Sequence, residues 1–332
     1  MKDLASFHRV HMAQLPTPIE PLYRLSLKLK GPTIWIKRDD RTGLAGGGNK
    51  ARKLEYLVAE ALKQKSDLLI TAGGAQSNHC RQTAAAAVRN RLGCDLVLGG
   101  SPPAIANGNL LLDELLGAEL HWTAPENRSQ AMEELAEKRR RQGRRPYVIP
   151  IGGSNRLGAL AYAVAMQETL NQLSQMDVDP DAIVFATSSG GTQAGLAVGA
   201  RIFGYYGRLL GISIDRTDSG PQPFRSELAA LANDLASLLQ LQETFQPQDF
   251  EINTDYLGEG YGRMGKPERD AIRLLAREEA VILDPVYTGR AMAGLLDMID
   301  KGVFSRKQNV LFWHTGGAPA VFAYAEEFLK TE

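Results

Sequence analysis

The stretch DLLITAGGAQSNHCRQTAAAAVRNRLGCDLVLGG, residues 67–100, decides the fold class. It begins with a short apolar run, Asp67–Ala72, and passes through a glycine-rich turn into a segment of helical period, Ser77–Arg91. A second apolar run, Cys94–Gly99, ends it. An apolar run, a helix and another apolar run form the β–α–β pattern of a parallel sheet. Such short apolar strands indicate a sheet covered by helices on both faces.

The same alternation extends along the chain in both directions. Further strand-like runs are Thr33–Arg38, Glu119–Trp122, Tyr147–Ile151, Ala182–Thr187, Leu209–Ile214, Val281–Leu283 and Asn309–His314. Further helix-like segments are Asn49–Gln64, Asn107–Leu116, Gln130–Arg141, Asn155–Leu173, Thr192–Phe203, Lys266–Glu279, Thr288–Ile299 and Pro319–Leu329. So many strand–helix units exceed one small doubly wound sheet, and the sequence therefore predicts two α/β domains.

Composition narrows the class of protein. The 332 residues carry 38 basic and 38 acidic side chains, and this neutrality argues against nucleic acid or an acidic membrane as the main partner. Two cysteines are too few for a secreted disulfide scaffold. The first residues show no apolar leader, and no run approaches the roughly 18 apolar residues of a membrane span. We therefore expect a cytoplasmic protein.

The turn Gly43–Lys50 precedes an amphipathic helix and places a lysine in its first turn. The helix dipole disfavours a cation there, which suits an amine that must lose its charge to act as a nucleophile. The spacing does not fit a phosphate-binding P-loop, because Asn49 separates the last glycine from Lys50 and Ala51 stands where a magnesium-binding hydroxyl belongs. This motif alone leaves another interpretation open, in which the turn is only structural and the lysine is solvated.

Two other turns are suited to anions. Ser77, in the turn Gly73–His79, is placed as a helix N-cap, and the free amides of such a helix start also form a carboxylate site. The turn Thr187–Thr192 combines hydroxyls, two glycines and a helix start, which favours a monoester phosphate.

Two alternatives remain on these residues. A strand, a glycine loop, a helix and a second strand ending at Asp215 follow the layout of a dinucleotide-binding fold, so a nicotinamide or flavin oxidoreductase is one alternative. Its fingerprint is incomplete, because Gln193 occupies the position of the second glycine. A non-catalytic anion-binding protein is the other. We expect no metal, because His8 and His11 lack acidic neighbours.

These turns, in this order, resemble the 1-aminocyclopropane-1-carboxylate deaminase/D-cysteine desulfhydrase family, which are pyridoxal-phosphate enzymes of fold type II, the tryptophan synthase β group. The motifs that carry the resemblance are Gly48-Asn49-Lys50, Gln76-Ser77-Asn78-His79, Asp284-Pro285-Val286-Tyr287 and His314-Thr315-Gly316-Gly317. The expected fold is two open, twisted, mostly parallel sheets with helices on both faces. Residues 1–49 plus 156–332 would form a large cofactor-binding domain, and residues 50–155 a small domain with Lys50 and the substrate carboxylate loop.

The resemblance also implies a role for each motif. Lys50 would hold pyridoxal 5′-phosphate as a Schiff base and move the proton on Cα of the substrate. Asn78 would bond the ring hydroxyl of the cofactor, and Thr315 would face its pyridine nitrogen. The phosphate would be held by Thr187, Ser188, Ser189, Gly190, Gly191 and Thr192. The substrate would be bound by Ser77, Asn78, His79, Tyr261, Tyr287 and Thr288, of which Ser77, Tyr261 and Tyr287 are also expected to be catalytic.

Thr288 separates the branches of the family. Cyclopropane deaminases carry glutamate at this position, and D-cysteine desulfhydrases carry threonine. The resemblance therefore implies α,β-elimination from D-cysteine to sulfide, pyruvate and ammonia. Another relative is L-cysteate sulfo-lyase, which the segments Asn253–Tyr256 and Gly258–Gly262 resemble more. L-Cysteate sulfo-lyase and cyclopropane deaminase are therefore the alternative activities. The partner would be a small amino acid, and the family implies a homodimer.

Overall fold

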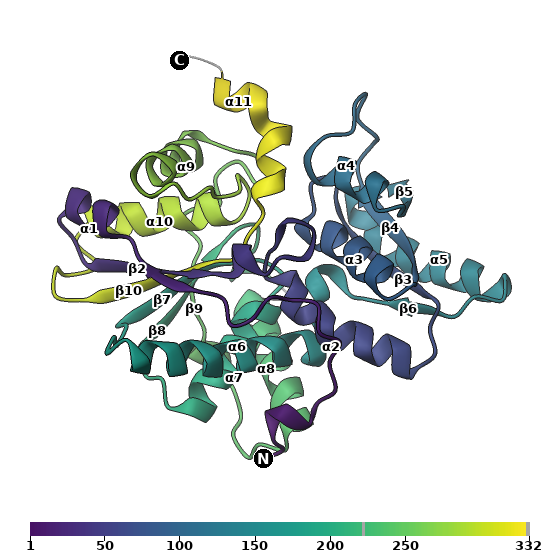
Figure 1. Cartoon of the computed structure of the whole chain (residues 1–332), viewed down its shortest axis with the longest axis horizontal. Helices are drawn as coiled ribbons and strands as arrows, with labels where there is room; N and C mark the ends of the chain where they lie inside the picture. The colour runs from purple at the N-terminus through teal and green to yellow at the C-terminus, as the bar shows by residue number, and fades with distance from the viewer. Residues whose placement is uncertain (221–222, 330–332) are drawn as a thin grey trace.

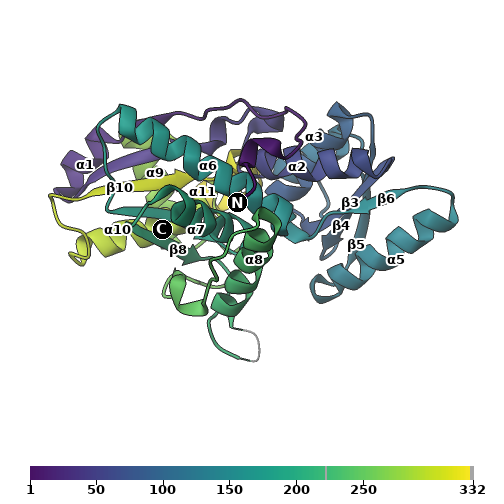
Figure 2. The same ribbon diagram turned by 90° about the horizontal axis from the view of Figure 1, so that it is seen from below.

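The chain is described by a computed structural model covering residues 1–220 and 223–329. In these residues the strands form two sheets, as Figures 1 and 2 show. The larger has the order β1–β2–β10–β7–β8–β9, with bounds Ile19–Pro21, Thr33–Arg38, Asn309–His314, Ala182–Thr187, Arg208–Ser213 and Glu251–Asn253. The smaller has the order β5–β4–β3–β6, with bounds Glu119–Thr123, Gly93–Gly99, Leu68–Gly74 and Pro146–Val148.

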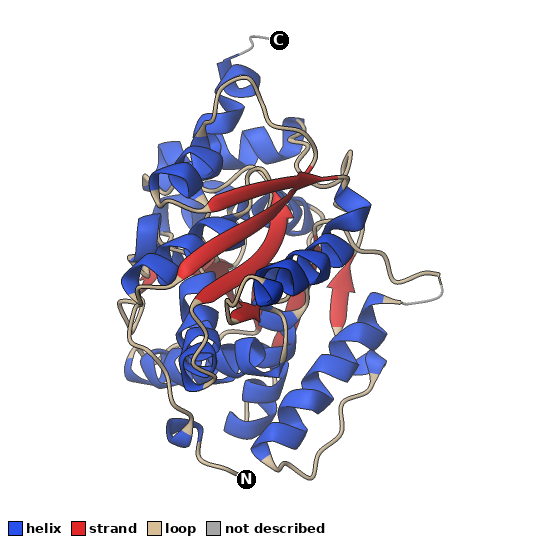
Figure 3. Cartoon of the chain, turned by 90° about the vertical axis from the view of Figure 1, so that its right-hand side faces the viewer, coloured by secondary structure: helices blue, strands red, loops and turns tan. Residues whose placement is uncertain are grey.

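Every strand pairing is parallel except that of the short strand β1 with β2. Helices pack around both sheets (Figure 3). Those from the first half of the chain are α1 Tyr23–Leu29, α2 Lys50–Lys63, α3 Asn78–Arg89, α4 Gly108–Leu115 and α5 Arg128–Arg141. The later ones are α6 Arg156–Gln175, α7 Gly191–Phe203, α8 Phe224–Leu239, α9 Lys266–Glu279, α10 Thr288–Asp300 and α11 Ala325–Leu329. Two mostly parallel sheets with surrounding helices confirm the predicted fold class.

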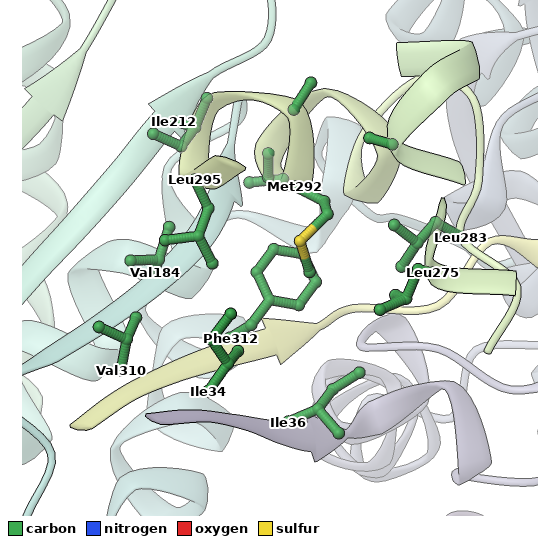
Figure 4. Packing of buried hydrophobic residues seen from close by; sticks show 14 of the residues in the cluster. Ile34, Ile36, Val184, Ile212, Leu275, Leu283, Met292, Leu295, Val310 and Phe312 are labelled. Carbon is green, nitrogen blue, oxygen red and sulfur yellow. The ribbon is translucent and has the colours of Figure 1, made fainter. Parts of the chain in front are cut away.

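The core of the larger sheet explains why its strands are so apolar. Alternate residues of neighbouring strands, such as Ile34, Phe312 and Val184, point towards one face and are fully buried there. Met292 and Leu295 of α10 pack on them, as the close-up in Figure 4 shows. Burying apolar area of this kind is the main force that holds a helix on a sheet.

The structure departs from the predicted elements in a few places. Strands β1 and β9 and helix α1 were not predicted. The predicted strand Val281–Leu283 is wrong. The carbonyl of Ile282 contacts the side chain of His314, at Nε2 and 3.0 Å, and these residues form no strand. The predicted helix Pro319–Leu329 starts as 3-10 turns, Ala318–Tyr324. The sequence also predicts a loop and a helix without an assigned role in residues 215–250, and the helix is α8; Pro221 and Gln222 lie outside the described residues.

The strand order agrees with two domains but does not define the residues at which they begin and end. Strands of the smaller sheet all come from residues 68–148, and those of the larger sheet come from residues 19–38 and 182–314. The proposed boundaries after residues 49 and 155 stay predictions. Among the described residues, no helix is both long and apolar enough to cross a bilayer.

Candidate active site

A cavity of about 390 Å³ lies where the carboxyl ends of β3, β4, β7, β8 and β10 approach one another. Ligands of open parallel sheets gather at such ends, because strands there feed turns and helix starts. The predicted residues that line the cavity are Lys50, Ser77, Asn78, His79, Thr187, Ser188, Ser189, Gly190, Thr192, Tyr261, Tyr287 and Thr315. Gly191 and Thr288 are not in its wall.

Two lysines share one acceptor at the floor of the cavity. Nζ of Lys50 donates to the carbonyl of Gly152 at 3.2 Å, and Nζ of Lys53, one helical turn later, donates to the same oxygen at 3.1 Å. Burial lowers the pKa of Lys50 to about 8, and burial together with the nearby Lys50 lowers the pKa of Lys53 well below its usual value. Lys50 therefore meets the requirement for a nucleophilic amine, which must be available in neutral form.

An anion cradle adjoins the lysines at the N-terminus of α7. Gly190 has φ of 84°, so a side chain there would be strained, and the chain turns directly into the helix. The amide of Gly191 donates to Oγ of Ser154 at 3.1 Å, and that hydroxyl donates to Ser189. A Cβ on Gly191 would lie 2.9 Å from Nζ of Lys53, which places the lysine beside the cradle. The hydroxyl of Thr187 is buried without a hydrogen-bond partner.

The second predicted turn caps α3. Oγ of Ser77 accepts from the amide of Cys80 at 3.2 Å, and only glycine fits at position 73, because a Cβ there would lie 2.4 Å from that oxygen. His79 is neutral, since burial and the nearby Lys50 hold its pKa well below its usual value. This helix start lies at the cavity wall, and the amides of a helix start suit a carboxylate.

The amide of Asn78 has a fixed orientation. Its Oδ1 accepts from Arg81 at 3.1 Å and from Nδ2 of Asn109 at 2.8 Å. Two donors on the oxygen turn Nδ2 towards Gly317, where a Cβ would lie 2.6 Å from it. Arg81 is fully buried and also donates to the carbonyl of Gly47 at 2.7 Å, so it ties Asn78 to the turn that precedes Lys50.

Two tyrosines form one wall of the cavity. The hydroxyls of Tyr261 and Tyr287 lie 2.9 Å apart and their rings meet edge to face. Asp284 sets the backbone of Tyr287, because one carboxylate oxygen accepts from the amides of Val286 and Tyr287, at 3.0 Å each. Its other oxygen accepts from both the amide and the hydroxyl of Thr288 at 2.7 Å, which explains why Thr288 is buried away from the cavity.

Comparison with known proteins identifies this arrangement. Residues 10–316 match the family described as pyridoxal-phosphate dependent enzyme. The chain belongs to this family. It is 44% identical to a D-cysteine desulfhydrase of Klebsiella pneumoniae (strain 342) and 43% identical to one of Salmonella typhi, each over 98% of both chains. Its cofactor is thus pyridoxal phosphate, and the nucleotide-binding and non-catalytic alternatives left open by the sequence are excluded.

Solved structures agree with the fold. A crystal structure described as an ACC deaminase homologue matches 98% of this chain and 97% of its own, with a TM-score of 0.89 and 39% identity. A threonine deaminase, at 19% identity and a TM-score of 0.65 over 91% of this chain and 92% of its own, shares the fold.

The residues present fit the cofactor. The unpartnered hydroxyl of Thr187 and the crowded amines of Lys50 and Lys53 are donors whose environment lacks an anion. A phosphate at the start of α7 would provide one. Lys53, Arg81, Asn109 and Asp284 were not predicted as site residues. The signal for Lys53 was its spacing of three residues from Lys50, which places both on one side of a helix.

Proposed function

We propose that this chain is a carbon–sulfur lyase that removes the β-substituent of D-cysteine and yields sulfide, pyruvate and ammonia. The observation that carries the proposal is Lys50, an amine of lowered pKa between an anion cradle and a helix start suited to a carboxylate. The names of relatives at 43–44% identity over nearly the whole chain support the substrate.

Each part of the site has a task in this proposal. Lys50 would hold the cofactor through its amine, and this amine, when free, would take the proton from Cα of the substrate. The turn Thr187–Thr192 and Lys53 would hold the phosphate. Nδ2 of Asn78 would hold the ring hydroxyl, and Thr315 would hold the pyridine nitrogen. Bound pyridoxal phosphate supplies the electron sink for the negative charge that develops at Cα.

The substrate is held from two sides. Ser77 and the amides of Asn78 and His79 bind its carboxylate, which fixes the Cα–H bond towards Lys50. Tyr261 and Tyr287 flank the β-substituent with paired hydroxyls. Burial raises the pKa of Tyr261 to about 12 and that of Tyr287 well above its usual value, so both are protonated donors at neutral pH. Thr288 acts on the substrate only through Asp284, whose carboxylate accepts from the hydroxyl of Thr288 and from the amide of Tyr287.

L-Cysteate and 1-aminocyclopropane-1-carboxylate are the alternative substrates. Thr288 argues against the cyclopropane acid as the substrate, because its hydroxyl is bound to Asp284 and it presents no acid group to the cavity. Sulfite and sulfide would leave by the same elimination, so L-cysteate is the closer alternative.

We also infer a cytoplasmic homodimer. Cys80 and Cys94 are buried free thiols, as expected in a reducing compartment. Ile105, Leu111 and Phe322 are exposed, and Asn107, between the first two in the sequence, donates to the carbonyl of Phe322 at 2.9 Å. An apolar surface of this kind favours association with a second copy. Light scattering of the purified protein measures the mass directly, and a monomer at micromolar concentration contradicts the dimer.

The test combines the visible spectrum with product assays. Purified enzyme is given D-cysteine, L-cysteate and 1-aminocyclopropane-1-carboxylate in parallel, and sulfide, sulfite and keto acid are measured. We expect an imine band that responds to D-cysteine with release of sulfide and pyruvate. Lys50→Ala should remove the band and lower kcat by about 10³-fold or more. Full activity in that variant contradicts the role of Lys50, and activity on L-cysteate alone contradicts the substrate.

A further inference from the structure

The charges that face the cavity are few. Among the described residues of its wall, the groups able to carry charge near neutral pH are Lys50, Arg128, Asp215 and His79, and His79 is neutral. In the proposed function Lys50 is either bound to the cofactor or free as a neutral base. Arg128 and Asp215 then remain as the fixed charges that a bound substrate meets.

Arg128 lies at the start of α5, on the side of the smaller sheet. Its Nε donates to the carbonyl of Pro125 at 2.7 Å, and the structure gives its two terminal nitrogens no hydrogen-bond partner among the described residues. Its stem lies over Gly99 at the end of β4, because a Cβ there would come 3.0 Å from Cδ of Arg128. The guanidinium is thereby held at the cavity with its donors available.

The field of Arg128 reaches the substrate-binding residues. Burial raises the pKa of Tyr261, and the positive charge of Arg128 acts in the opposite direction on the same hydroxyl. Burial also raises the pKa of Asp215, which follows β8 on the side of the larger sheet, while Ser188 and the charges of Arg216 and Arg128 oppose that shift. The cavity thus has a cationic side on the smaller sheet and an anionic side on the larger.

We infer that Arg128 binds negative charge on the β-substituent of the substrate. This rests on the proposed function. The amino group of the substrate goes to the cofactor and its carboxylate to the turn of Ser77, so the side chain is the part left for Arg128. Asp215 repels an anion from the opposite side. The pocket therefore places an anionic β-substituent, such as a thiolate or a sulfonate, against Arg128 and away from Asp215.

The same contact assists the departure of the substituent. The proton leaves Cα for Nζ of Lys50, the electron pair of that bond forms the Cα–Cβ double bond, and the substituent leaves with the Cβ–S electron pair. Charge on the leaving sulfur group grows during this step. A guanidinium already in place stabilises it without reorganisation.

The test compares a neutral with an anionic substituent in the holoenzyme. 3-Chloro-D-alanine is the neutral substrate, and D- and L-cysteate are the anionic ligands, measured as inhibitors of its turnover. In Arg128→Gln we expect the inhibition constant of cysteate to rise about tenfold or more, as for the loss of a charged hydrogen bond. The KM for 3-chloro-D-alanine should change less than about twofold. Arg128→Lys should recover part of the affinity, because it keeps the charge.

Controls separate this idea from its rivals. Arg140→Gln, on the same helix but paired with Glu137 at the surface, should leave both constants unchanged. Asp215→Asn should strengthen cysteate binding. If Asp215→Asn and Arg128→Gln instead weaken the neutral and anionic ligands equally, the two residues pair with each other and the inference is overturned. Wild-type enzyme that processes no β-substituted alanine contradicts the proposed function. Normal turnover with an unchanged cysteate constant in Arg128→Gln contradicts this inference alone.

Discussion

The first turn of α2 carries buried cations that are held in opposite ways on its two sides. Arg52 donates to both oxygens of Asp39 at 3.0 and 3.1 Å, and to both oxygens of Glu168 at 2.8 and 2.9 Å. Lys50 and Lys53 share the carbonyl of Gly152, Lys53 also reaches Oγ of Ser154 at 3.5 Å, and neither lysine pairs with a carboxylate of the described residues. The paired side raises the pKa of Arg52 beyond its ordinary value, whereas the unpaired side lowers the pKa of Lys50 and Lys53.

The two sides of this helix turn therefore have different tasks: the Arg52 side supports the fold, and the lysine side is available for chemistry. Asp39 also accepts from Tyr162 at 2.7 Å and from Trp313 at 2.8 Å, so the charge on the Arg52 side is fully satisfied within the protein. A satisfied buried cluster fixes geometry but has no capacity left for a ligand. The lysines lack a negatively charged partner within the protein, and a bound anion provides one. One helix turn is thus anchored on one side and reactive on the other.

The largest expected effect comes from breaking the anchored side. Asp39→Asn leaves Arg52 buried with one carboxylate fewer and should lower the free energy of unfolding by about 3–5 kcal/mol. Urea unfolding followed by circular dichroism measures it. The control is Arg208→Gln, which breaks an exposed pair with Glu251 and should cost less than about 1 kcal/mol. Equal losses in the two variants would mean that the cluster is no anchor.

Lys53→Met tests the reactive side with a smaller effect. Loss of a charged contact to the phosphate should weaken binding of pyridoxal phosphate by about tenfold to about a hundredfold. The stability of the cofactor-free protein should stay the same or rise, because a buried amine without a counter-ion is removed. Titration of the cofactor-free protein, followed by fluorescence, gives the dissociation constant. Unchanged affinity combined with lower stability would place Lys53 with the anchoring residues instead.

The smallest effect concerns pH. The folded chain holds the pKa of Lys50 at about 8 against an ordinary 10.5, so between these values the unfolded chain binds a proton that the folded chain has released. The stability of the cofactor-free protein due to Lys50 should therefore rise as pH increases from about 8 to about 10. Lys50→Ala should flatten this rise in urea unfolding. A wild-type stability that falls through this interval as steeply as in the variant would contradict the lowered pKa.

Sequence reasoning reached the helices and strands of the β–α–β units because their periodicity is local. Thr33–Arg38 and Ala182–Thr187 were predicted with the bounds that the structure has. Strand β1 was missed, since three residues with a proline carry no alternation and are fixed only by pairing with β2. Val281–Leu283 has the apolar pattern of a strand, but a side chain of β10 takes one of its carbonyls.

The candidate site was predictable where a turn carries its own signal. The glycine turns and the helix starts mark Lys50, Ser77 and the cradle of α7 directly. Asn109 has no such signal, because its contact with Asn78 depends on how α4 packs on α3. Arg81 lies one turn after Asn78 on α3, and this spacing is the signal that points to their contact. In the sequence Arg128 is one charge among many on a polar helix, and only the closeness of Gly99 brings it to the cavity.

The pairing of β2 with β10 has a consequence for the order of synthesis. Residues 33–38 hydrogen-bond with residues 309–314, and the amide of Asn49 donates to the carbonyl of Thr315 at 2.8 Å. The turn that bears Lys50 is therefore fixed only after residues 309–315 have been translated. Contacts so distant along the chain form late and slow folding. A nascent chain should accordingly be unable to capture its cofactor until β10 has left the ribosome.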